Sequence, residues 1–227
     1  MFGADGSLYG ATFNGGLGSG VVFKLTPPVS GSGAWTESVL YAFTGGNDGG
    51  FPHSSVAFDA AGALYGTTMS GGASGSGVVY RLTPPRSGGG AWTQSVLYSF
   101  TGGNDGGDPL AGVIIDPPGV LYGTAYSGGT VGYGVVYSLT PPTTPAGKWT
   151  QAVLHSFTGV SRQNLKGGVR SGVVYDGSSP HDGVIFDTAG GLYGAAQYGA
   201  AAGFGSVYKL QAIARPSGCT FTPPPAK

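Results

Sequence analysis

The sequence contains few charged residues, and this scarcity excludes several classes of partner. Charged residues make up only 9% of the 227 residues, and ten Lys and Arg balance ten Asp and Glu. Proteins that bind nucleic acid usually carry a basic stripe that neutralises phosphates, and no such stripe is present here. We therefore expect no nucleic-acid partner.

Cysteine and long apolar runs are also scarce. Cys219 is the single cysteine, so the chain cannot form an intrachain disulfide. No apolar run approaches the roughly 18–20 residues that a membrane-spanning helix needs, and we expect no membrane span. The segment Met1–Gly6 enters the first repeat without a signal-peptide pattern. A leader removed earlier and a fragment of a longer array both fit this start.

Glycine, in contrast, is abundant. With 47 Gly and 16 Pro, these two residues make up more than a quarter of the chain, a composition that indicates disorder when it lacks a period. Here 40% of the residues are hydrophobic and 12% are aromatic, and they fall in short regular runs that can form a core. The glycines are therefore interpreted as turns between strands of one domain of ordinary size.

The tripeptide Leu-Tyr-Gly recurs four times, and each copy is followed by a Gly-rich stretch and a short apolar run. The copies begin at Leu8, Leu64, Leu121 and Leu192. Repeats longer than about 40 residues that are built from β-type segments are typical of propellers. The repeat units are about 1–55, 56–112, 113–183 and 184–227, and the third is longer because of an insert at about 160–173.

The second unit shows the strand pattern most clearly. Its apolar or alternating runs are separated by Gly-rich turns and by Pro84-Pro85, which cannot donate to a β-ladder. The expected strands are Val56–Phe58, Leu64–Met69, Val78–Leu82 and Trp92–Phe100. The sequence thus predicts an all-β fold over residues 1–227, a small β-propeller of four four-stranded blades, with a fifth, degenerate blade in the insert as the alternative.

Both ends of the repeat array are ragged. Only Met1 and Phe2 precede Gly3, so the first unit lacks most of its first strand, and Cys219–Thr222 is a weak fourth strand for the last unit. One strand from each terminus could complete a shared blade, which would remove the exposed edges. Otherwise the edges invite association, so the sequence predicts a monomer or a dimer through open blade edges.

The repeat resembles a known family. The pattern Asp-Gly-x-x-Pro, then Val-x-x-Asp-x-x-Gly-x-Leu-Tyr-Gly-Thr-Thr, then Gly-x-Gly-Val-Val-Tyr-x-Leu is similar to the GloVer tandem repeat of bacterial, largely exported proteins. This resemblance implies a propeller and a secreted or periplasmic location in a bacterium, and it confers no activity. The segment Val184–Tyr193 is more weakly similar to NHL-type and gluconolactonase-like propellers. That similarity implies that the first strand of each unit lines the central channel.

The most regular polar feature is the loop that leads from one unit into the first strand of the next. Each copy contains an Asp-Gly dipeptide at a fixed spacing before the Val that opens the strand. The residues are Asp48, Asp105 and Asp176, with Asn47 and Asn104 directly before the first two. If these loops meet at the channel mouth, their oxygens could bind Ca²⁺, which takes 6–8 oxygen ligands. The alternative is that each Asp caps its own Asp-Gly turn.

Two of these loops also carry a histidine. His53 and His181 follow the loop proline, where the middle copy has Leu110. Histidine titrates near neutrality and often serves as a general base. Beside a cation-bound water it could deprotonate that water for attack on a lactone or ester carbonyl. The alternative is a pair of surface-loop histidines without a catalytic role.

His155 differs from the other two histidines. It replaces Tyr41 and Tyr98 of the sibling units within an outer strand, so we expect it to pack rather than to react.

Two functional hypotheses from different classes follow. The first is a calcium-dependent lactonase or esterase with Asp48, Asp105 and Asp176 around the cation and His53 or His181 as general base. The second is a non-catalytic module that presents the same face to a glycan, a surface partner or a neighbouring copy. The substrate is a small lactone or ester in the first case, and fold alone does not decide between the two.

Overall fold

The computed structural model describes residues 1–29, 31–86, 89–144, 146–159, 176–199 and 204–210 of the chain. Within these ranges the chain forms fourteen β-strands and no helix, which confirms the all-β prediction. The described part of the chain accordingly contains no helix that could cross a membrane.

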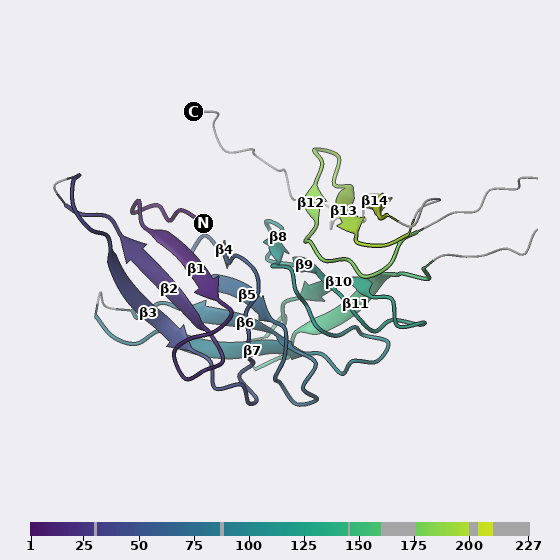
Figure 1. The fold of residues 1–227 in the computed structure, drawn as a ribbon, viewed down its shortest axis with the longest axis horizontal. Coiled ribbons are helices and arrows are strands. Elements are labelled where there is room, and N and C mark those ends of the chain that lie inside the picture. Colours follow the sequence, from purple (N-terminus) through teal and green to yellow (C-terminus); the bar gives the residue numbers. More distant parts are fainter. Residues whose placement is uncertain (30, 87–88, 145, 160–175, 200–203, 211–227) are drawn as a thin grey trace, which may run out of the picture.

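The strands form four antiparallel sheets, one for each copy of the repeat (Figure 1). The first sheet consists of β1 (Leu8–Thr12), β2 (Val21–Thr26) and β3 (Thr36–Ala42). The second consists of β4 (Ala57–Phe58), β5 (Leu64–Thr68), β6 (Val78–Thr83) and β7 (Thr93–Ser99). The third consists of β8 (Ile114–Ile115), β9 (Leu121–Ala125), β10 (Val135–Thr140) and β11 (Thr150–Ser156). The fourth consists of β12 (Ile185–Phe186), β13 (Leu192–Ala196) and β14 (Ser206–Leu210).

In each sheet the strands pair in sequence order, and in the second and third sheets they run from a two-residue first strand to a seven-residue outer strand. The first sheet has no equivalent of the short strands β4 and β8. Phe2 instead forms an isolated bridge with Leu8, at the position where Phe58 pairs with Leu64 in the second sheet. The amino-terminal end therefore pairs within the first sheet. The insert at 160–173 and the weak strand at Cys219–Thr222 lie outside the described residues.

The Leu-Tyr-Gly motif has a direct physical explanation in the sheet. Gly66 of β5 lies opposite Tyr80 of β6, and Gly123 of β9 lies opposite Tyr137 of β10. A Cβ atom on Gly123 would lie 2.8 Å from Cζ of Tyr137, well inside ordinary contact distance. The glycine is required because the hydroxyl end of the cross-strand ring occupies the space that a Cβ atom would need.

Adjacent sheets are joined by apolar cores that are built from largely equivalent positions. The first core contains Tyr9, Val22 and Phe43 from one sheet and Val56, Leu64, Val78, Tyr80 and Leu82 from the next. Equivalent positions form the cores between the second and third and between the third and fourth sheets. Each core includes an edge-to-face ring pair, Phe43–Tyr80, Phe100–Tyr137 and Phe157–Tyr208, with centroids 5.0, 5.1 and 5.1 Å apart. Since the contacts repeat, each sheet is placed on its neighbour in the same way.

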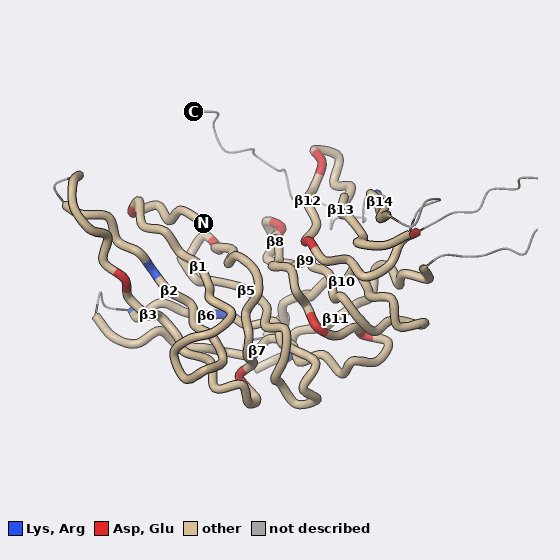
Figure 2. The backbone as a smooth tube through the Cα atoms, in the orientation of Figure 1, with Lys and Arg blue, Asp and Glu red and all other residues tan. Residues whose placement is uncertain are grey.

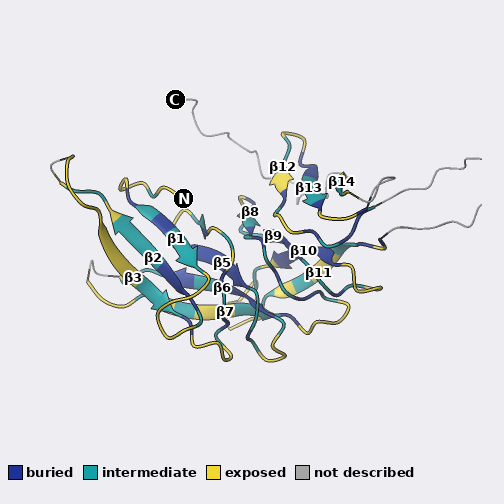
Figure 3. Ribbon diagram, in the orientation of Figure 1, coloured by how far each residue is buried: buried dark blue, intermediate teal, exposed yellow. Residues whose placement is uncertain are grey.

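The four sheets follow one another along an open arc, with the first sheet at one end and the fourth at the other (Figure 1). Charged residues are few and scattered along the backbone (Figure 2). The middle strands β5 and β9 are buried along their whole length, whereas the outer strands carry exposed positions (Figure 3). This pattern of antiparallel sheets in series is consistent with a propeller-like fold.

Candidate functional site

The loops that lead into β4, β8 and β12 enclose a hollow of about 340 Å³. Each loop contributes the same three consecutive positions to its lining. These are His53, Ser54 and Ser55 from the first loop, Leu110, Ala111 and Gly112 from the second, and His181, Asp182 and Gly183 from the third. The predicted convergence of the three loops is therefore found at the residues that directly precede the first strands.

The structure brings His53 and His181 together across this hollow. Their ring centroids are 5.6 Å apart and the rings are nearly perpendicular, at 83°. Phe13 packs edge to face on His53, and Tyr126 packs edge to face on His181. Both imidazoles are exposed, so a ligand in the hollow can reach them.

An unusual backbone conformation directs each loop into the hollow. Phe51, Asp108 and Ser179 all have positive φ, at 58°, 51° and 55°, and each directly precedes the loop proline. A non-glycine residue with positive φ is uncommon and is retained only where its surroundings hold it. In the first loop, Phe51 N–H donates to the carbonyl of Ser19 at 2.7 Å, and the Phe51 carbonyl accepts from Met69 N–H at 3.1 Å.

The other two loops repeat these backbone bonds. Each loop is thus fixed to the preceding sheet as well as to its own.

Two threonines hold the loops from the side. Thr67 of β5 donates to the carbonyl of Ala111 at 2.8 Å, and Thr124 of β9 donates to the carbonyl of Asp182 at 2.9 Å. Both bonds run from one sheet to the loop of the next. The lining residues are therefore placed by rigid strands, which favours a preformed site.

Asp48 and Asp105 lie at the far end of the same loops and are occupied by local hydrogen bonds. Thr44 N–H and Tyr41 O–H each donate to Oδ2 of Asp48 at 2.9 Å, and the hydroxyl of Thr44 donates to Oδ1. Asp105 has the equivalent contacts with Thr101 and Tyr98. These contacts are the ones expected when a carboxylate caps a turn.

The same contacts influence ionisation. Partial burial acts to raise the pKa of Asp48, but the hydrogen bonds from Thr44 and Tyr41 outweigh it and lower the pKa below its usual value. Asp105 follows the same pattern with Thr101 and Tyr98. Burial, together with the bond to Asp48, raises the pKa of Tyr41 to about 12.

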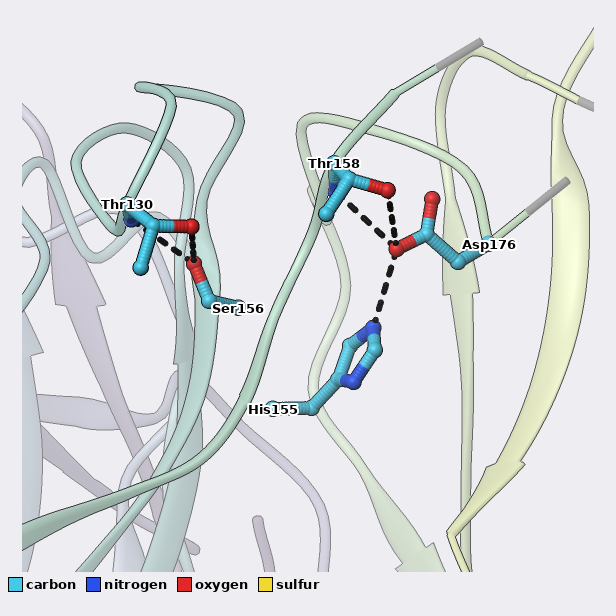
Figure 4. Close-up of polar contacts among 5 residues, drawn as sticks. All are labelled: Thr130, His155, Ser156, Thr158 and Asp176. Carbon is cyan, nitrogen blue, oxygen red and sulfur yellow. Dashed lines mark hydrogen bonds and ion pairs between the residues drawn. The ribbon is translucent and has the colours of Figure 1, made fainter. Parts of the chain in front are cut away.

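Asp176 belongs to a variant of this arrangement in which histidine replaces tyrosine (Figure 4). His155 Nε2 lies 3.3 Å from Oδ2 of Asp176, and Thr158 donates to the same oxygen through its N–H and its hydroxyl at 2.9 and 3.0 Å. The ring of His155 packs edge to face on Phe157, 4.8 Å between centroids. His155 therefore packs as predicted, and it also contacts the loop carboxylate, as Tyr41 and Tyr98 do.

The three aspartates are held in separate turns and do not meet one another. Among the described residues, no three His, Cys, Asp or Glu side chains form a group that could hold a metal ion. Asn47 and Asn104 are exposed beside their turns, and Oδ1 of Asp176 is buried without a hydrogen-bond partner in the described part of the chain. The hydrogen bonds favour the turn alternative, and calcium binding at these five residues stays a prediction.

Sequence reasoning missed two groups that shape the hollow. The threonines that hold the loops follow directly after Leu-Tyr-Gly, as Thr67 and Thr124, and their recurrence was a usable signal. The left-handed residues Phe51, Asp108 and Ser179 share no side-chain chemistry, so no residue pattern could have revealed them. Of their immediate neighbours, only the proline that follows is common to all three loops.

The sheet series, its repeated cores and its repeated loops define an all-β tandem-repeat protein. The model of the Gloeobacter/Verrucomicrobia repeat matches residues 1–175, which confirms the expected GloVer-type repeat. The chain belongs to this repeat family. A comparison with curated proteins finds no match for the chain.

Proposed function

We propose that the four sheets are blades of a β-propeller and that the hollow at its channel mouth binds a small polar ligand. The observation that carries this proposal is the approach of His53 and His181, at 5.6 Å between ring centroids, over a hollow built from three equivalent loops. A fifth blade in the insert is the alternative for the blade number. The function itself does not depend on that number.

The lining chemistry favours a hydroxyl-rich ligand such as a glycan. Ser54, Ser55 and Asp182 lie beside the two imidazoles, and such side chains donate to and accept from sugar hydroxyls. The volume of about 340 Å³ falls at the small end of the range for ligand sites. A single sugar ring or a molecule of similar size matches this space, with the aromatic Phe13 and Tyr126 at its border.

Ligand binding is best tested on the histidine rings, because the chain contains only three histidines. In a titration with mono- and oligosaccharides followed by two-dimensional NMR of the rings, we expect the signals of His53 and His181 to shift. The ring of His155, which contacts Asp176 at the outer strand, serves as an internal control and should not move. A titration in which no ring signal moves, or in which His155 moves equally, would contradict this assignment.

Hydrolysis of a small lactone or ester is the second candidate, and the same pair of exposed imidazoles supports it. In this case His53 or His181 acts as the general base toward water. Replacement of either one by alanine is expected to lower the rate about 100-fold or more without a change in melting temperature. His155→Tyr is the matched control, since it restores the residue of the sibling units. Equal rates in all three variants would remove the histidines from any catalytic role.

A calcium ion would polarise the carbonyl in such a reaction, and the panel should be run with added calcium and again with a chelator. Turnover that requires calcium supports the calcium-dependent hydrolase. If no turnover occurs either with calcium or with chelator, the result supports the non-catalytic binding module. A secreted or periplasmic location in a bacterium rests on the family resemblance alone. Fractionation of a bacterium that makes the protein tests that location.

A further inference from the structure

The two ends of the arc present complementary apolar faces that nothing in the described part of the chain covers. We define the leading face of a blade as the positions that contact the next blade, and the trailing face as those that contact the preceding blade. In the first core the leading face contributes Tyr9, Val22 and Phe43, and the trailing face contributes Val56, Leu64, Val78, Tyr80 and Leu82. Among the described residues no further sheet packs on the trailing side of the first blade or on the leading side of the fourth (Figure 1).

The exposed fraction of one repeated valine shows whether the leading face of a blade is covered by a neighbouring blade. Val22, Val79 and Val136 are each 0% exposed, because the next blade covers them, whereas Val207 of β14 is 82% exposed. The four residues occupy the same position in the strand that pairs with the Leu-Tyr-Gly strand. The fourth blade therefore presents two of the three leading-face positions, Tyr193 and Val207, with no neighbouring blade in the described part of the chain.

The trailing face of the first blade is likewise uncovered among the described residues. Phe2 is 69% exposed and bridges Leu8 as Phe58 pairs with Leu64. Phe58 packs edge to face on Tyr9 of the preceding blade, with centroids 4.9 Å apart. Phe186 packs on Tyr122 in the same way, at 5.1 Å. Phe2 thus occupies the position of the phenylalanine in such a pair, but in the described part of the chain no preceding blade supplies the tyrosine.

We propose that the open leading face of the fourth blade binds the open trailing face of the first blade in a second copy of this chain. The three internal interfaces specify this occupant, because each joins these two faces and no other combination. In the contact between copies, the second copy's Phe2 packs on Tyr193, the position that corresponds to Tyr9 and Tyr122. The interface is heterologous, that is, two different patches meet, so it forms rings when the rotation closes.

The contact is tested by measuring the molar mass of the purified 227-residue chain over a range of concentrations. Sedimentation velocity or light scattering is expected to show association that depends on concentration. Val207→Asp places a charge in the apolar contact, and we expect it to weaken association about 100-fold or more. Phe2→Asp should have the same effect from the other side. Val131→Asp, at an exposed loop position of the third blade, is the control and should associate like the parent chain.

A mixing experiment separates this contact from a symmetric pairing of edges. The Val207→Asp chain keeps its trailing face, and the Phe2→Asp chain keeps its leading face, so the mixture should form one-to-one heterodimers although each variant alone is monomeric. Circular dichroism melts check that both variants remain folded. A parent chain that is monomeric at all concentrations, or a mixture that stays monomeric, overturns the proposal. A monomer that Val207→Asp destabilises would show that this chain covers the face itself.

Discussion

Replacing the glycine of one Leu-Tyr-Gly motif by alanine should reveal how tightly the repeat is packed. In Gly123→Ala the new Cβ would lie 2.6 Å from the hydroxyl oxygen and 2.8 Å from Cζ of Tyr137. Tyr137 is fully buried and packs against Phe100, so its ring has no free space to enter. Overpacking of this kind costs about 1–3 kcal/mol.

A smaller effect opposes this cost. Gly123 lies within β9 and does not have a positive φ, so alanine adds no backbone strain there. It also reduces the conformational freedom of the unfolded chain, which stabilises by about 0.4–1 kcal/mol. We therefore expect a net loss of about 1–2 kcal/mol. For a protein of this size that loss lowers the melting temperature by roughly 2–8 °C.

The first copy of the motif offers a matched control. In Gly10→Ala the Cβ would come equally close to a ring, 2.7 Å from Cζ of Phe23. Phe23 lies on the open trailing face and is only partly buried, so it can turn aside. Thermal melts should show a clear loss for Gly123→Ala and little for Gly10→Ala in the monomeric protein. Equal losses would refute the claim that ring confinement makes glycine necessary.

A double mutant examines the same contact directly. Tyr137→Phe removes the hydroxyl oxygen that is nearest to the new Cβ, so the combination with Gly123→Ala should recover part of the lost stability. The expected coupling free energy is about 1 kcal/mol, within the range for residues in contact. Strictly additive effects would mean that the ring does not press on the strand.

Three further predictions concern stability. Tyr137→Phe alone should raise the free energy of unfolding by about 1 kcal/mol in denaturant titrations, because its buried hydroxyl has no hydrogen-bond partner among the described residues; a loss instead would reveal a bound partner such as water. Asp48 and Asp105 have folded pKa values below the unfolded value of 3.8, so they stabilise the fold above about pH 4 and lose this effect as the pH falls through the folded pKa. The double variant with asparagine at both positions should therefore show a flatter dependence of melting temperature on pH below about pH 4, and an unchanged slope would contradict this. If calcium binds only to the folded protein, a chelator should lower the melting temperature and added calcium should restore it, whereas identical melts assign the aspartates to their turns alone.

The repeat pattern was sufficient to predict the sheets but not all of their contacts. Alternating apolar runs and Gly or Pro turns located every strand of the second unit to within a few residues, because period and turn chemistry are local properties. The contact between His155 and Asp176 could not be derived in the same way. It depends on how an outer strand meets a loop that lies far along the sequence, and the substitution of His for Tyr indicated packing alone.

The loop aspartates and the loop histidines also show that repeat spacing does not determine where a loop side chain lies. Both sets recur at fixed spacing, and convergence at the channel mouth was predicted for each. The structure places His53 and His181 at the hollow and leaves Asp48 in a turn with Thr44. A few residues of loop separate the two sets, and a residue with positive φ lies between them. Spacing alone carries no information about such a backbone conformation.

A tandem repeat also indicates where function is to be sought, because its scaffold positions must agree between copies. The loop proline, the left-handed residue before it and the Val that follows all keep their roles in the three loops, since each takes part in the same bonds and cores. The position directly after the proline is free of these constraints and holds His53, Leu110 and His181. Two histidines there pack edge to face on each other over the hollow and remain exposed to solvent. That contrast between an invariant frame and a variable lining favours the hollow, rather than the frame, as the first place to test for ligand binding.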